Sequence, residues 1–322
     1  MREIIFSKIN KKRWLEAEQL LTKKQKVDPE VISKVYMQLS DDLSYARTYY
    51  PNSNTTAYLN KLVLNSHQFM HTAKRENWSR IYTFFKKDYP LLIHSHYKQL
   101  FYSCLIFVIA VLIGAFSAAN DVDYVRLITG DNYVNMTIEN IEKGEPLGVY
   151  ASQNEISMFF MITLNNIRVA LIAFAMGALL SVGTAFMLFK NGVMLGSFQY
   201  FFYNYNLLWE SASGIWMHGT IEIFSIVVAG AAGLVMGNSI LFPGTYSRIH
   251  SFQKGAIAGV KIVTGLVPFF IIAGFIESFL TRHSQIQWLS ILVIAISLIT
   301  IIFYFFIYPH LVYKKHVQHI SA

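Results

Sequence analysis

The sequence has very few of the groups that crosslink or catalyse. It contains one cysteine, Cys104, which lies in an apolar run, so an intramolecular disulfide is excluded and no cysteine-based zinc site is visible. Charge is also scarce: 14% of the residues are charged, whereas 54% are hydrophobic. This balance excludes an ordinary soluble globular protein and indicates a membrane protein.

The few charges are unevenly distributed. Residues 1–98 hold 17 of the 27 Lys and Arg and 9 of the 19 Asp and Glu, which gives 17 − 9 = +8, the formal charge of the whole chain. Basic residues of a membrane protein gather on the cytoplasmic side, where they fix orientation and meet anionic headgroups. We therefore expect a lipid bilayer as the main partner and no nucleic acid.

The N-terminal sequence lacks the features of a signal peptide. Its first twenty residues, MREIIFSKINKKRWLEAEQL, are charged and amphipathic, with neither an apolar core nor a small-residue cleavage site. We expect this end to remain in the cytoplasm.

Helical periodicity predicts a basic cytoplasmic domain over residues 1–88. A short helix is expected over 7–24. A second, over 28–50, begins with Asp28 as N-cap and Pro29 at the first helical position. Its apolar stripe needs a partner, and the stripe from Leu59 to Ala73 can supply one.

Long apolar runs predict a transmembrane domain over residues 89–322. Five runs are long enough to span a bilayer, and a sixth, shorter one carries Gln199, Asn204 and Asn206. The five are 99–119, 169–189, 217–241, 257–280 and 287–308, and the sixth is 193–208. The sequence NGVMLGS predicts a tight turn between the second and third segments. The fold class is thus an all-α, polytopic helical bundle of about six transmembrane helices.

Six spans place both termini in the cytoplasm. On that side lie five basic residues: Lys190, Arg248, Lys254, Lys314 and Lys315. The loop 120–155 then lies outside, with two basic and seven acidic residues, a balance of 2 − 7 = −5. Within it, DNYVNMTIENIEKGEP predicts a short amphipathic helix. If 193–208 re-enters instead of crossing, this topology changes.

Several polar residues lie within or beside the predicted spans and form an intramembrane polar cluster: Asn166, Arg168, His218, Glu222 and Glu277. His218 and Glu222 are four residues apart, so they share a helix face. Charged groups in a bilayer are costly and should face the bundle interior. Three interpretations are open: a structural network in which Arg168 pairs with a glutamate, a path for ions or polar ligands, and a metal site. The metal reading ranks last because HGTIE supplies one His and one Glu.

Small residues repeat at four-residue spacing in the fourth and fifth spans, at Ala229, Gly233, Gly237, Gly255 and Gly259. Such faces let helix backbones approach closely. We expect them to pack helices within one chain; a homodimer seam is the alternative.

Several sequence blocks occur in an order that identifies a family. They are RWLEAEQLL, VYMQLSDDLSYARTYYPN and YLNKLVLNSH in the N-terminal part, and NNIRVALIAFAMGALLSVGT, KNGVMLG, HGTIEIFSIVVAGAAGLVMG, PGTYSR and AGFIESFL in the membrane part. The chain resembles the stage II sporulation protein M family over nearly its whole length.

The resemblance implies a multi-spanning protein of the bacterial inner membrane. It also implies that the family's motif positions are Asn166, Arg168, Gly192, His218, Gly219, Glu222, Gly233, Pro243, Gly244 and Glu277. Partners implied by it are peptidoglycan hydrolases, which the namesake accompanies during engulfment, or a MoxR-type ATPase in bacteria that form no spores.

We therefore expect a non-enzymatic scaffold or anchor of an envelope complex, with neither cofactor nor metal. The alternative is a transporter or channel-like protein that uses the polar cluster as its site, and an intramembrane hydrolase is a more remote one.

Overall fold

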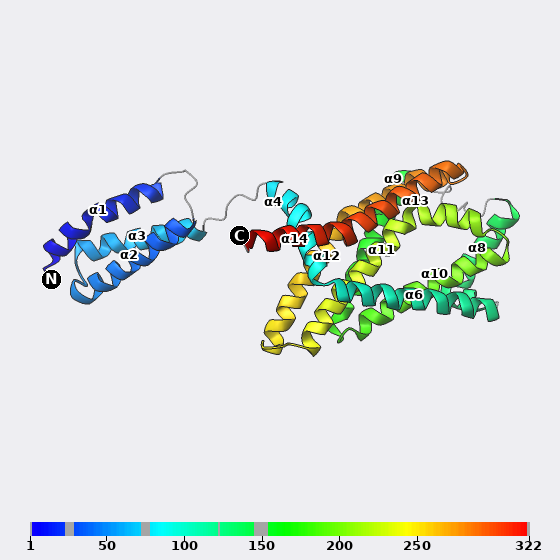
Figure 1. The fold of residues 1–322 in the computed structure, drawn as a ribbon, viewed down its shortest axis with the longest axis horizontal. Coiled ribbons are helices and arrows are strands. Elements are labelled where there is room, and N and C mark those ends of the chain that lie inside the picture. Colours follow the sequence, from blue (N-terminus) through cyan, green and yellow to red (C-terminus); the bar gives the residue numbers. More distant parts are fainter. Residues whose placement is uncertain (1, 23–28, 72–77, 122, 145–153, 321–322) are drawn as a thin grey trace. The chain divides into compact units, whose positions relative to one another are not determined.

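The computed structural model describes residues 2–22, 29–71, 78–121, 123–144 and 154–320, and every regular element in these ranges is helical (Figure 1). The chain divides into two compact units, Met1–Arg80 and Ile81–Ala322. The all-α class predicted from the sequence is thus confirmed for the described residues.

The N-terminal unit is built on three helices, α1 (Glu3–Thr22), α2 (Pro29–Tyr49) and α3 (Asn54–His71). Helix α2 begins at the proline that the sequence indicates, whereas the predicted N-cap Asp28 lies outside the described residues. The three helices bury one small core, made of Phe6, Trp14, Ala17, Leu39, Leu43, Ala46, Leu59 and Leu62. This unit therefore has a hydrophobic core of its own.

The described part of the second unit, called the membrane unit below, contains five helices that are long and apolar enough to cross a bilayer: Tyr97–Asn120, Glu155–Ala178, Leu208–Leu241, Arg248–His283 and Gln287–Gln318. Its elements are α4 (Trp78–Thr83), η1 (Phe84–Asp88), α5 (Tyr89–Ser95), α6 (Tyr97–Asn120), α7 (Tyr124–Thr129), α8 (Asp131–Glu142), α9 (Glu155–Ala175), η3 (Met176–Ala178), α10 (Val182–Asn204), α11 (Leu208–Leu241), α12 (Arg248–Phe275), η4 (Ile276–Leu280), η5 (Thr281–His283), α13 (Gln287–Ile301), η6 (Ile302–Ile307) and α14 (Tyr308–Ile320).

The predicted boundary between the second and third membrane segments is wrong. The apolar run 169–189 is not one span, because the chain turns at Leu179–Ser181, where Leu180 and Ser181 have φ of 53° and 69°. The helix that follows, α10, therefore has 23 residues rather than the short 193–208 segment. At about 1.5 Å per residue it is roughly as long as a bilayer core is thick.

The predicted turn at NGVMLGS is also wrong, since these residues lie inside α10. A Cβ atom at Gly192 or Gly196 would overlap backbone oxygens of Phe107 and Val111, both in α6. These glycines allow α10 to lie directly against α6, which explains why small residues recur there.

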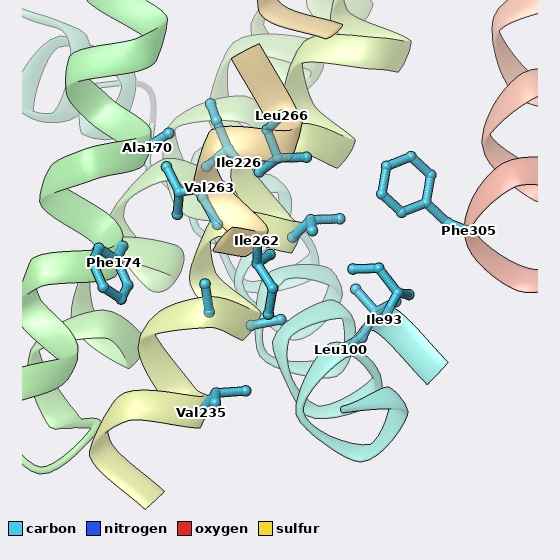
Figure 2. Packing of buried hydrophobic residues seen from close by; sticks show 14 of the residues in the cluster. Ile93, Leu100, Ala170, Phe174, Ile226, Val235, Ile262, Val263, Leu266 and Phe305 are labelled. Carbon is cyan, nitrogen blue, oxygen red and sulfur yellow. The ribbon is translucent and has the colours of Figure 1, made fainter. Parts of the chain in front are cut away.

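Helix α11 is the centre of the membrane unit and contacts α6, α9, α10, α12 and α13. Its neighbours bury a large apolar core that includes Ile226, Val235, Ile262 and Leu266 (Figure 2). Ile93 of α5 joins the same core, as does Tyr89. Phe84 also packs against this core, and the division between the two compact units falls after Arg80, whereas the sequence predicts it after residue 88.

Candidate functional site

Helix α11 supplies two of the polar side chains that the sequence indicated. His218 and Glu222 lie one helical turn apart, and His218 is only 5% exposed. Both face a cavity of about 440 Å³ inside the membrane unit, which we call the polar cavity. Its polar lining includes Thr129, Tyr133, Asn165, Asn166, Asn191, His218, Glu222 and Glu277.

Glu277 reaches the same cavity from a π-helical turn, η4, which interrupts the long helix Arg248–His283. Such turns are rare and are often found at functional sites. The Glu277 Oε1 atom lies 3.8 Å from His218 Nε2. One potential ligand atom from each of His218, Glu222 and Glu277 lies within 4.8 Å of the others.

Thr281 orients the imidazole of His218. Its hydroxyl lies 3.1 Å from His218 Nδ1 and 3.3 Å from the carbonyl oxygen of Ile276, to which it donates. Since a hydroxyl has a single proton, the Thr281 oxygen accepts from Nδ1–H. The Nε2 atom of His218 therefore presents a lone pair towards Glu277.

Helix α9 contributes Asn166, which is 5% exposed and lines the cavity. Its Nδ2 atom is buried and has no hydrogen-bond partner among the described residues. It interacts with the Glu222 carboxylate without meeting the geometry of a normal hydrogen bond, so a water or ligand between the two groups would satisfy both.

Arg168 does not join the cluster. Its side chain is exposed, it is not part of the cavity lining, and the structure shows no ion pair between it and Glu222 or Glu277. Arg168 follows Asn166 by two residues, which on an α-helix turns it to nearly the opposite face. The arginine–glutamate network expected in the structural interpretation is therefore absent at this site.

Two short helices of the acidic loop line part of the cavity, although the sequence predicted only one helix there. Ile128 and Thr129 of α7 and Tyr133 of α8 form part of its wall. Helix α8 matches the predicted amphipathic helix. The sequence does not predict that α8 lines the cavity. An amphipathic pattern shows that a helix has an apolar face, but not which part of the protein that face covers.

Thr281 was also missed. It stands four residues after Glu277, a spacing that places both near one helix face, so the signal was present in the sequence. On sequence grounds a metal site ranks last among the three interpretations, because HGTIE by itself supplies only one His and one Glu. The structure adds Glu277 from another helix, and the three residues together form a set that can hold a metal ion.

The predicted packing residues lie at contacts between helices of the same chain. Gly233 faces Thr184 and Ala173, Gly237 faces Ser181, and Ala229 is fully buried. On α12, Gly255 faces Ser239 and Gly259 faces Phe174. These contacts hold α11 against α9, α10 and α12, and so position His218 and Glu222.

Comparisons with known proteins match a different family to a part of each unit, so the resemblance to one family over nearly the whole chain, expected from the sequence, is narrowed to the membrane unit. The family described as "Stage II sporulation protein M" matches residues 103–282, and a "Domain of unknown function (DUF8413)" matches residues 5–72. No curated protein and no solved structure matches the chain. The first match contains Asn166, His218, Glu222 and Glu277, and it covers more than half of the sequence. The chain therefore belongs to the stage II sporulation protein M family.

Proposed function

We propose that the protein is a non-enzymatic scaffold of a bacterial envelope complex, in which the membrane unit anchors the chain and the N-terminal unit captures a partner protein. The observation that carries this proposal is the surface of α1. Exposed apolar side chains on a folded helix are typical of protein interaction sites when they gather in one place.

Helix α1 is apolar on two sides. Phe6, Trp14 and Ala17 are buried in the core of the N-terminal unit. Ile4 and Ile9, in contrast, are 80% and 65% exposed, and Ile5 and Leu15 are exposed beside them. A helix that only had to fold would need one apolar stripe, so the second stripe has another purpose.

The charge beside this stripe indicates the chemistry of the partner. Exposed lysines lie close to the isoleucines along α1: Lys8 precedes Ile9, and Lys11 and Lys12 follow it. We propose a partner surface that is apolar with an acidic rim, since complementary charge guides encounter and orientation. The MoxR-type ATPases and peptidoglycan hydrolases implied by the family resemblance are the proteins to look for first.

The proposed location is the cytoplasmic membrane, with six spans and both termini inside. Helix α10 supplies the sixth span, and the positive-inside rule then puts Arg248, Lys254, Lys314 and Lys315 in the cytoplasm. Lys190 lies within α10 with an exposed side chain, so it reaches the interface by extension.

Labelling of single cysteines tests this topology. In a Cys104→Ala background, a cysteine placed at Glu139 of α8 should react with an impermeant maleimide from outside intact cells. A cysteine at Tyr246, between α11 and α12, should react only after the cells are opened. The reverse pattern, or equal labelling of both, contradicts the proposed orientation.

Partner capture is tested by placing acidic residues at exposed apolar positions of α1. Full-length protein carrying Ile5→Asp and Ile9→Asp should lose the proteins that crosslink to the wild type in native membranes. Leu64→Asp, at an exposed leucine of α3, is the matched control and should retain them. If the double variant still crosslinks to the same proteins, α1 is not the site that binds the partner.

A second candidate function is favoured by the polar cavity. An intramembrane cavity lined by His218, Glu222 and Glu277 suits a transporter or channel-like protein, because ionisable groups in membranes often mark ion paths. Glu277→Gln should then alter proton or Na⁺ flux in proteoliposomes while the protein remains monodisperse. Unchanged flux at wild-type levels of insertion would argue against transport.

A further inference from the structure

We propose that His218, Glu222 and Glu277 bind one divalent transition-metal ion in the polar cavity. This inference goes beyond the scaffold role and does not depend on it. It rests on the geometry of three donor side chains from two helices, on the unpartnered amide of Asn166, and on the charge balance of the cavity.

The donor atoms are oriented for a metal. The Thr281 hydroxyl accepts from His218 Nδ1–H, which leaves the Nε2 lone pair directed towards Glu277. Metal-ligating histidines are usually fixed in this way, with the second ring nitrogen hydrogen-bonded to a neighbouring group. The 3.8 Å between Nε2 and Glu277 Oε1 is too long for a hydrogen bond between them.

The distances suit a single bridging ion. Bonds from Zn²⁺ to imidazole nitrogen or carboxylate oxygen are about 2.0–2.2 Å, so two ligand atoms of one ion are separated by roughly 3–4 Å. The pair His218–Glu277 is already in this range, and all three donors lie within 4.8 Å.

The charges favour a dication. Two carboxylates face each other in a cavity whose described lining includes no Lys or Arg. Burying such groups without compensation is costly, and one dication neutralises both. A metal ion therefore removes the electrostatic penalty that the arrangement carries.

Asn166 supplies the independent sign of a ligand. Its side chain is more than nine-tenths buried, lines the same cavity and has an unpartnered Nδ2 atom among the described residues. An amide donor at this point suits a water molecule bound to the metal. The protein group with which this amide interacts is the Glu222 carboxylate, so Asn166 can also orient this proposed ligand.

The donor set also limits the kind of metal. One imidazole nitrogen with two carboxylates is typical of Zn²⁺, Mn²⁺ or Fe²⁺ sites, whereas Ca²⁺ prefers oxygen donors alone and Cu⁺ prefers sulfur. The only cysteine of the chain, Cys104, is not part of this lining. Zn²⁺ and Mn²⁺ are the probes to use.

The test is direct binding to full-length protein purified in detergent without a histidine tag and stripped with a chelator. Equilibrium dialysis with metal analysis should find one Zn²⁺ or Mn²⁺ per chain in the wild type. Glu277→Gln and Glu222→Gln should each weaken binding at least tenfold. His250→Gln, which changes an exposed histidine, is the matched control and should bind as the wild type does.

Thr281→Val keeps all three donors and should weaken binding by about 10–100-fold, as the loss of an orienting hydrogen bond does elsewhere. X-ray absorption of the Zn²⁺-loaded wild type should show one imidazole with oxygen donors, a result that needs no variant to fold. Absence of stoichiometric binding, binding retained by both glutamate variants, or a spectrum of several imidazoles would each overturn the proposal. These experiments measure metal binding and not ion transport. A negative result in the transport assay would therefore leave the metal-binding proposal intact.

Discussion

Asp42 is the residue that joins α1 to α2 in the N-terminal unit. Its Oδ2 atom accepts from Arg13 at 2.5 Å and from the indole Nε1 of Trp14 at 2.8 Å. Trp14 is only 4% exposed, so its N–H cannot turn to water if this acceptor is lost. The contact therefore fixes the register of the two helices as well as adding stability.

Asp42→Ala should lower the free energy of unfolding of the N-terminal unit by about 1–3 kcal/mol, because a buried donor is left unsatisfied. Asp41→Ala, at the exposed neighbouring aspartate, should have little effect. Chemical denaturation of residues 1–80 measures both. Equal destabilisation by the two changes would mean that the acid acts through helix charge and not through Trp14.

Tyr58 links the stability of the same unit to pH. Burial, with a hydrogen bond to the Glu18 carboxylate, raises the pKa of Tyr58 to about 12. The folded unit therefore keeps the phenolic proton after the unfolded chain has lost it. This contribution is complete below pH ~10 and is lost as the pH rises towards 12.

Denaturation at pH 9 and pH 11 should show a fall in stability for wild-type residues 1–80 and a smaller fall for Tyr58→Phe. The difference between the two proteins isolates Tyr58 from the other tyrosines. Parallel falls would show that the Glu18 contact does not carry the effect.

The sequence could group His218, Glu222, Glu277 and Asn166, because each interrupts an apolar run with a polar side chain. It could not exclude Arg168, since the sequence alone does not show that this arginine, within α9, faces away from the cluster. Nor could it show that Tyr133 closes the cavity, because that depends on how α8 folds back over the bundle.

Among the elements, α11 depends most on small residues. A Cβ atom at Gly233 would overlap the Thr184 hydroxyl and the carbonyl oxygen of Ala173. Overpacking of this kind costs about 1–3 kcal/mol. The gain of about 1 kcal/mol from replacing glycine by alanine within a helix does not offset the upper part of that range.

Gly233→Ala should therefore lower the thermal midpoint of the detergent-solubilised protein. Gly219→Ala in the same helix is the control, since its nearest neighbour is the movable end of the Ile223 side chain at 3.3 Å. Differential scanning fluorimetry compares the two. A Gly233→Ala protein as stable as Gly219→Ala would mean that α9 and α10 move apart without cost.

Helix ends were harder to predict than helices. Hydropathy is continuous across 169–189, so it does not reveal that Leu180 and Ser181 turn the chain with positive φ. Because the chain turns there, α10 begins at Val182 and is longer than the predicted segment 193–208. This helix packs against α6. Gly192 and Gly196 are consistent with close packing of a helix against α6, whereas the sequence analysis interprets them as part of a turn.

At the scale of the whole molecule, the two units each have a separate core. Charge and hydropathy predict two domains that divide after residue 88; the compact units divide after Arg80, and Phe84 packs against the core of the membrane unit. A unit with its own core is expected to fold alone.

Residues 1–80 expressed alone should be soluble and helical, and should unfold in one cooperative transition. Residues 81–322 should insert into membranes without them. Circular dichroism and membrane fractionation provide the measurements. A fragment 1–80 that stays unfolded until the membrane unit is added would show that its core is insufficient.

The π-helical turn that carries Glu277 has a consequence for how this family can vary. Such a turn holds one residue more than the α-helical turn it replaces, and each residue rotates a helix by about 100°. Deleting Ser278 or Phe279 would keep the helix and its hydropathy, yet would turn Thr281 by about 100° relative to Glu277. The number of residues in this turn therefore decides whether Thr281 can contact His218 while Glu277 lines the cavity.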